Sequence, residues 1–315
     1  MNNHLKPKII FWGTPKFAVN PLHQLVKNEY EVILVITQPD KPIGRKQKLQ
    51  PGEVKIFSQK KGLKLLQPIK LKNEVFINEI KSLNPDLMIV AAYGKILPDE
   101  ILKIPRLGSL NIHASLLPKY RGASPIASSI LNGDKETGIT IMLMDEKMDT
   151  GPIVYQEKID IPEKINAPEL NVKLSEFGAI VLVKILPKYI TGEIKPSKQD
   201  DSKATYTKIL TKEDGRIDWN KEADYIERMT RAFYPWPSAW TTWHDKKIKI
   251  LKAMSKQNSS SKNPGEVIKT NEGLVGVQCG QRLLVIEELQ LEGKKTLKTA
   301  EFLRGQKDFI GSKFI

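Results

Sequence analysis

The sequence has a single cysteine, Cys279, and only four histidines in 315 residues. One thiol excludes an internal disulfide, which fits a reducing compartment. The cysteine and the histidines are scattered without the spacing that metal-ligand sets require, so we predict no metal site.

Long apolar runs are also missing, because no stretch approaches the roughly 20 apolar residues of a membrane span. The first residues, Met1 to Lys8, are polar and lack both the apolar segment of a secretory signal and the Arg- and Ser-rich pattern of a presequence. These absences predict a cytoplasmic protein. The G-x-G-x-x-G fingerprint of dinucleotide-binding folds is absent too, and we interpret Gly13, Thr14 and Pro15 as a tight turn between a strand and a helix.

Positive charge is what the sequence has in excess, with 50 Lys and Arg against 36 Asp and Glu and a net charge of +14. A basic protein attracts polyanions, although a Lys-biased, solvated surface gives the same count. After residue 207 there are 20 basic against 14 acidic residues, and before it 30 against 22. This spread suits a polyanionic ligand that touches both halves of the chain, and it suits compositional bias equally well.

Short apolar runs alternate with helical spacing in the first half of the chain. Val- and Ile-rich strands are predicted at 9–12, 30–37, 88–92 and 110–113, with a helix at 17–27. Strands that alternate with helices are typical of parallel sheets. The predicted fold class is therefore α/β, with a doubly wound, Rossmann-like, mostly parallel sheet.

The pattern changes near residue 190. Residues 191–207 are polar, which predicts a linker between a first domain at 1–190 and a second at 208–315. Several short strands with turn signals in the second domain indicate a small OB-like β-barrel. We expect helices at 223–233 and 299–304, strands at 239–243, 247–253, 265–268, 274–279 and 282–291, and core positions for Trp219, Trp236 and Trp240.

Residues 38–55 are rich in chain breakers and show no periodicity, which predicts a mobile loop without regular structure. Its basic residues, Arg45, Lys46 and Lys48, would on pattern alone be a solvated surface. On a flexible segment they are also suited to folding onto a phosphate backbone.

The stretch from Gly108 to Gly151 contains the candidate chemistry. Side chains alternate faces along a strand, so Asn111 and His113 would point the same way. An amide and an imidazole that face one space can hold a carbonyl oxygen and stabilise the charge that develops when a nucleophile attacks it. Asp149, in a turn after a second apolar run at 138–144, is the candidate carboxylate that would set the charge of the imidazole or take a proton. A lone histidine in a strand is more often a hydrogen-bonded core residue, so the hypothesis needs the surrounding motif.

That motif resembles the formyltransferase family that uses 10-formyltetrahydrofolate, whose catalytic pattern is an Asn, a His and an Asp. Segments 206–219, 231–237 and 291–295 resemble the C-terminal domain of the branch of this family that acts on charged initiator tRNA, so the resemblance covers nearly the whole chain. The matching residues of the first domain are Asn111, His113, Ser115, Leu116, Leu117, Pro118, Arg121, Gly122, Thr137, Gly138, Thr140, Asp149, Thr150, Gly151 and Pro152.

The resemblance implies an enzyme for translation initiation, which transfers a formyl group from 10-formyltetrahydrofolate to the α-amine of methionyl initiator tRNA without a metal. Asn111 would bind the formyl oxygen, His113 would stabilise the oxyanion, and Asp149 would orient His113 and help remove the amine proton. We expect a monomer. The resemblance places folate contacts at Ser115, Leu116, Leu117 and Pro118 and at the backbone of Met88, Ile89, Val90, Ala91 and Tyr93, and tRNA contacts at Arg45, Lys46 and Lys48.

Three alternatives stay open at this point. A formyltransferase for a sugar-nucleotide amine also has a C-terminal domain, whereas one for glycinamide ribonucleotide needs none. The third alternative is a non-catalytic RNA-binding protein with a formyltransferase-like domain. The basic loop favours tRNA over the first two, and the intact set of Asn111, His113 and Asp149 argues against the last.

Overall fold

The computed structural model describes residues 6–43, 48–257 and 262–315. The chain forms two compact units, and two short segments from the middle of the chain belong to the second unit. The first unit comprises Met1–Gly122, Glu136–Asp160 and Asn171–Thr207, and the second comprises Ala123–Lys135, Ile161–Leu170 and Lys208–Ile315.

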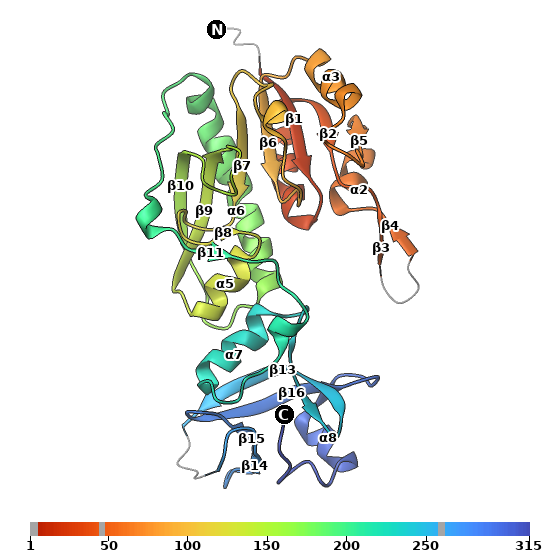
Figure 1. Cartoon of the computed structure of the whole chain (residues 1–315), viewed down its shortest axis with the longest axis vertical. Coiled ribbons are helices and arrows are strands. Elements are labelled where there is room, and N and C mark those ends of the chain that lie inside the picture. The colour runs from red at the N-terminus through yellow and green to blue at the C-terminus, as the bar shows by residue number, and fades with distance from the viewer. Residues whose placement is uncertain (1–5, 44–47, 258–261) are drawn as a thin grey trace. The chain divides into compact units, whose positions relative to one another are not determined.

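A seven-stranded sheet forms the centre of the first unit (Figure 1). Five neighbouring strands pair in parallel, and the two strands at one edge of the sheet, the last two in chain order, pair antiparallel. This confirms the mostly parallel sheet. In sheet order the strands are β10 (Ile153–Asp160), β9 (Glu136–Leu143), β7 (Ser109–His113), β6 (Leu87–Ala91), β1 (Lys8–Gly13), β2 (Glu31–Ile36) and β5 (Leu65–Leu66).

Helices cover both faces of this sheet, as its almost wholly apolar inner strands require. On one face, β1, β2 and β6 pack with α3 (Glu74–Ser82) and α4 (Asp99–Leu102). On the other face, Gly178 of α6 (Ala167–Ile190) packs against Ile112 and Ile139, and Ser175 bonds to Asn20 of α1 (Val19–Lys27). A short helix, η1 (Lys16–Ala18), precedes α1. Among the described residues, no helix combines the length and the apolar content needed to cross a membrane.

The prediction that residues 38–55 lack regular structure is wrong at both ends of the stretch. β3 (Lys41–Ile43) and β4 (Lys48–Gln50) pair as a two-stranded antiparallel ribbon, and α2 (Glu53–Lys60) begins soon after it. Proline in β3 is compatible with pairing because a two-stranded ribbon consists of edge strands. Arg45 and Lys46 lie outside the described residues, as does the side chain of Lys48.

The stretch predicted as a linker, 191–207, contains a short helix, η2 (Asp201–Lys203), and a strand, β11 (Tyr206–Thr207). β11 pairs in parallel with β8 (Arg121–Gly122), and Ser197 forms a bridge with Ile153 at the start of β10. The whole stretch is therefore part of the first unit.

The second unit is built on a curled antiparallel sheet, a half-barrel, which confirms the predicted class of small β-domain. Register shifts in its longest strand, β13, help the sheet to curl. Its path runs β12 (Ala239–Trp243), β13 (Lys246–Lys256), β16 (Leu283–Leu291), β15 (Val275–Gln278) and β14 (Val267–Lys269), with β17 (Leu297–Lys298) beside β16. The helices of this unit are α5 (Pro125–Asn132), η3 (Glu213–Gly215), α7 (Ala223–Ala232) and α8 (Thr299–Gly305).

Two of the three tryptophans expected in the core of this unit are there. Trp219 and Trp240 are 5% and 7% exposed, but Trp236 is 57% exposed, so the expectation for Trp236 is wrong. Trp236 lies between two prolines in the turn after α7, where no strand or helix period directs a side chain inward.

Candidate active site

The candidate site is assembled at the end of β7, where the parallel strands of the sheet reach their carboxyl edge. Ligands of open α/β sheets bind outside this edge. Asn111 pairs with Met142 of β9, and His113 pairs with Thr140 of the same strand. This register fixes the positions of both side chains along the strand direction. As the strand period predicted, Asn111 and His113 both reach the same carboxylate, that of Asp149, while Ile112 packs under α6.

Asp149 lies in the turn that connects β9 to β10, and this turn folds back along β9. Leu143 donates its N–H to the carbonyl of Pro152, and a Cβ on Gly151 would come within 1.8 Å of the Leu143 carbonyl oxygen. Only glycine permits this close approach. Asp149 itself has a φ of 56°, in the left-handed region, where a non-glycine residue is strained by about 1–2 kcal/mol.

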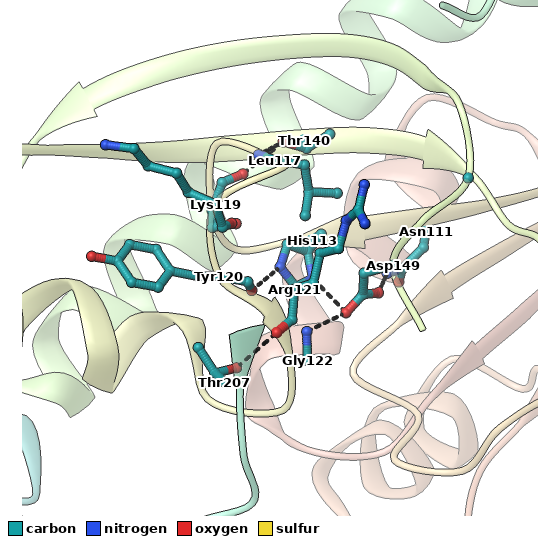
Figure 2. A network of polar contacts seen from close by, with 12 residues as sticks. Asn111, His113, Leu117, Lys119, Tyr120, Arg121, Gly122, Thr140, Asp149 and Thr207 are labelled. Carbon is teal, nitrogen blue, oxygen red and sulfur yellow. Dashed lines mark hydrogen bonds and ion pairs between the residues drawn. The ribbon is translucent and has the colours of Figure 1, made fainter. Parts of the chain in front are cut away.

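The Asp149 carboxylate lies between three groups (Figure 2). Its Oδ2 accepts a hydrogen bond of 2.8 Å from the N–H of Gly122 and lies 3.6 Å from His113 Nδ1. Its Oδ1 lies 3.5 Å from Asn111 Nδ2, a long contact. The His113 and Asp149 side chains are 6% and 14% exposed, so their electrostatic interaction is stronger than it would be in bulk water.

The other ring nitrogen of His113, Nε2, lies 3.0 Å from the carbonyl oxygen of Tyr120. A carbonyl only accepts hydrogen bonds, so Nε2 is the protonated donor in this contact. Nδ1 is the ring atom that faces Asp149. The contact of Nε2 with Tyr120 fixes the orientation of the ring.

Gly122, the donor to Asp149, is held by β11. Its φ is 109°, and a Cβ there would lie 2.2 Å from the carbonyl oxygen of Thr207. The preceding residue, Arg121, is 1% exposed, and its N–H donates to the carbonyl of Thr205. Burial alone would lower the pKa of Arg121, but hydrogen bonds to Asp201 and Tyr206 outweigh it and raise the pKa.

The residues predicted to contact folate after β7 form a tight turn. The Ser115 hydroxyl donates to the carbonyl of Lys119, and its own carbonyl accepts from the Thr140 hydroxyl. The Leu117 N–H donates to the same hydroxyl. These internal bonds fix the shape of the turn, which also contains Leu116 and Pro118, and they occupy the Ser115 hydroxyl. Folate contact here stays a prediction.

The second set of predicted folate contacts lies in and after β6. Met88, Ile89 and Val90 pair with strands on both sides, whereas Ala91 pairs with β1 alone. Tyr93 is buried, burial raises its pKa to about 12, and its carbonyl accepts from the side chain of Gln38. At the carboxyl end of β6, one side of the backbone is therefore not paired with a strand and is available to a ligand. Folate contact by these residues stays a prediction.

Two residues without a predicted role, Gln199 and Gln156, also bond to the site. Gln199 donates to the carbonyls of Asp149 and Gly151, and Gln156 donates to the carbonyl of Leu117 and to the Thr140 hydroxyl. The sequence did point to Thr140 and Arg121, because both belong to the family motif. Nothing in the sequence pointed to Gln199, since it lies in a polar stretch remote in sequence from the motif.

Within the ranges that the structure describes, no three His, Cys, Asp or Glu side chains come together as a metal site.

Comparison with known proteins agrees with this geometry. Residues 7–186 match the family model for formyl transferase, and residues 209–307 match that for its C-terminal domain. The chain belongs to the formyl transferase family, as predicted. It is 46% identical over 299 residues to the methionyl-tRNA formyltransferase of Caldanaerobacter subterraneus subsp. tengcongensis, covering 95% of this chain and 96% of the relative.

Two solved structures share the fold. One is HypX from Aquifex aeolicus in complex with tetrahydrofolic acid, at 17% identity and a TM-score of 0.65, which covers 97% of this chain. The chain spans 48% of the length of HypX. The other is WlaRD, a sugar 3N-formyl transferase, at 24% identity and a TM-score of 0.64, covering 92% of this chain and 99% of WlaRD.

Proposed function

We propose that the protein transfers the formyl group of 10-formyltetrahydrofolate to the α-amine of methionyl initiator tRNA, as a monomer in the cytoplasm. The observation that carries the proposal is the convergence of Asn111 and His113 on the carboxylate of Asp149. The methionyl-tRNA formyltransferase that matches 95% of the chain supports the tRNA substrate. Formyl transfer belongs to residues 1–190 and tRNA binding to residues 208–315, with 191–207 between them.

Asn111 binds the formyl oxygen in this mechanism. Its Nδ2 lies at the long distance of 3.5 Å from Asp149, so an N–H can turn to a substrate oxygen without breaking a strong bond. His113 Nδ1 lies on the same side of β7, and when it carries a proton, as Nε2 does, it can donate to the oxygen on which negative charge develops.

Asp149 takes part in the proton transfer. When the methionyl nitrogen attacks the formyl carbon, it becomes positively charged and must lose a proton, and Asp149 is the carboxylate beside both Asn111 and His113. The C–N bond to folate then breaks, and the folate nitrogen takes up a proton. The products are formylmethionyl-tRNA and tetrahydrofolate.

The decisive assay is transfer of a labelled formyl group to initiator tRNA charged with methionine. We expect labelled formylmethionyl-tRNA with charged tRNA and no transfer with uncharged tRNA. A sugar-nucleotide amine serves as the competing acceptor. Preferred transfer to that amine, or no transfer to either acceptor by folded protein, would contradict the proposal.

We further propose that Arg45, Lys46 and Lys48 contact the tRNA, which the basic composition of their segment supports. Arg45→Ala should lower kcat/KM on charged tRNA by more than a screened surface charge explains, because misplacement by about 1 Å costs roughly a hundredfold in rate. Lys46→Ala and Lys48→Ala should only weaken binding and reduce its salt dependence. The measurement is kcat/KM at low and high salt, and an Arg45→Ala deficit that vanishes at high salt would show a surface charge alone.

A further inference from the structure

Gln199 connects the stretch before β11 to the turn between β9 and β10 that contains Asp149. It is 5% exposed, and its Nε2 donates hydrogen bonds of 2.8 Å and 2.7 Å to the carbonyl oxygens of Asp149 and Gly151. Both N–H groups of the amide are thereby used on the backbone of one turn. The hydrogen bonds of Gln199 go to the backbone of the turn and to Arg121, and not to the side chains of Asp149, Asn111 or His113, so its influence on those side chains passes through the turn.

Arg121 fixes the other end of the Gln199 amide. Its Nε and Nη2 atoms lie 3.1 Å and 2.9 Å from Gln199 Oε1. The guanidinium is held in turn by Asp201 at 2.7 Å and by the Tyr206 hydroxyl at 3.2 Å. A guanidinium only donates and a carbonyl only accepts, so the amide can face in one direction only. Hydrogen bonds therefore hold the Gln199 amide between the buried guanidinium of Arg121 and two backbone carbonyls.

The turn needs such stabilising hydrogen bonds because the backbone of Asp149 is in the left-handed region, with a φ of 56°. Strained backbone of this kind persists only where surrounding contacts determine it. The Asp149 carboxylate is fixed by the N–H of Gly122, and its carbonyl by Gln199. Without the second bond, the turn can relax and move the carboxylate away from His113 Nδ1.

We propose that Gln199 is a positioning residue for the reaction, holding Asp149 at the distance from Asn111 and His113 that proton transfer requires. The inference rests on the proposed role of Asp149. It also gives residues 199–206 a function beyond connection, because Gln199, Asp201 and Tyr206 all belong to this stretch.

Two substitutions in the full-length chain separate positioning from packing. Gln199→Met keeps the volume of the side chain but removes every hydrogen bond. Gln199→Glu keeps an acceptor for Arg121 but places carboxylate oxygens against the carbonyls of Asp149 and Gly151. Both should lower kcat by roughly 10- to 100-fold, as expected for a misplacement of about 1 Å or less. KM for the folate donor and for charged tRNA should stay within about twofold of wild type, because Gln199 contacts protein groups only.

The pH dependence gives a readout that a structural role would not change. At low pH the carboxyl group introduced by Gln199→Glu becomes protonated and regains an O–H donor toward the turn. The kcat of Gln199→Glu relative to wild type should therefore rise as the pH falls, whereas that of Gln199→Met should not. Ser197→Ala, close to Gln199 in the sequence but exposed, is the matched control and should keep wild-type kcat.

The outcomes are distinct. Wild-type kcat in both Gln199 variants, or loss of the fold in both by circular dichroism, overturns the positioning role. Asp149→Asn separates this result from failure of the proposed mechanism. If Asp149→Asn retains wild-type turnover, the role of Asp149 itself is wrong. If Asp149→Asn is inactive while Gln199→Met keeps wild-type kcat, only the positioning role is overturned.

Discussion

The contacts of His113 divide its two ring nitrogens between different tasks. Nε2 is 3.0 Å from a backbone carbonyl that fixes the ring, and Nδ1 is 3.6 Å from Asp149. The second distance is long for a hydrogen bond, and catalytic contacts commonly shorten when substrate binds. In the proposed mechanism, the Nδ1 side of the ring therefore acts in the reaction and the Nε2 side fixes the orientation of the ring.

The first prediction is that His113→Ala lowers kcat by about 100- to 1,000-fold, the usual loss when one oxyanion donor is removed. Donor binding should change little, because His113 faces Asp149 and not the predicted folate turn. Turnover on charged tRNA and equilibrium binding of the folate donor measure the two effects. His23→Ala, an exposed histidine on α1, is the control. A loss of folate binding with turnover intact would reverse the assignment.

Burial raises the pKa of the single cysteine, Cys279, from 9.0 to about 12. The unfolded chain therefore releases this proton at lower pH than the folded chain does. The stabilisation is fully present below pH 9 and is lost as the pH rises toward 12, with a limiting slope of about 1.4 kcal/mol per pH unit.

We accordingly predict that the free energy of unfolding falls more steeply with pH in wild type than in Cys279→Ala. The comparison is sharpest between pH 9 and 10, below the range in which Tyr93 begins to contribute. Urea titrations followed by tryptophan fluorescence measure it. The slope and not the absolute stability is the readout, because the substitution also leaves a small cavity. Parallel slopes would contradict the prediction.

At the scale of single elements, the turn between β9 and β10 is the most constrained part of the site. Three features act on a few residues: the close approach of Gly151 to Leu143, the left-handed backbone of Asp149, and the two bonds from Gln199. A change in any of them displaces the same carboxylate.

We predict that Gly151→Ala lowers kcat by about 100-fold or more, because its Cβ would lie 1.8 Å from the Leu143 carbonyl oxygen and push the turn away from β9. Activity and thermal stability of the purified variant measure the effect. Gly62→Ala is the control: Gly62 also has a positive φ, of 67°, but nothing lies within 4 Å of the methyl group that the substitution adds, so only stability should fall, by about 1 kcal/mol. Wild-type turnover in Gly151→Ala would show that the turn tolerates displacement.

At the scale of the whole molecule, the two units do not follow the linear division of the chain. α5 lies in the first half of the sequence but packs in the second unit, where Arg228 of α7 donates to the carbonyl of Leu131 at 2.9 Å. Arg231 likewise donates to the carbonyl of Ile165, and it forms an ion pair with Glu227.

A chain that ends at Thr207 should therefore be less stable than the full chain, because α5 and residues 161–170 lose the helix on which they pack. We predict a lower melting temperature together with weaker tRNA binding. Differential scanning calorimetry and a tRNA binding titration measure them. The double substitution Arg228→Met and Arg231→Met in the full chain is the companion variant, and it should lower stability while leaving residues 208–315 in place. A truncated chain as stable as the intact one would show that α5 and residues 161–170 need no support from residues 208–315.

Local sequence patterns determined much of the fold and of the candidate site. The alternation of strands and helices predicted the parallel sheet, and the two-residue period along β7 predicted that Asn111 and His113 face one space. Turn residues and a family motif placed Asp149 with them. Such inferences succeed because periodicity and turn chemistry act over a few residues and survive any packing that buries the apolar face.

Other features were decided only by the tertiary structure. Gln199 lies in a polar stretch that predicts a linker, and nothing local indicates that it reaches the turn of Asp149 from about 50 residues away in the sequence. The same is true of α5, whose sequence belongs with the first domain and whose packing belongs with the second unit. Trp236 is exposed although its apolar ring predicts burial. In each case the outcome depends on which distant backbone groups and surfaces lie beside the residue, and only the folded chain brings those together.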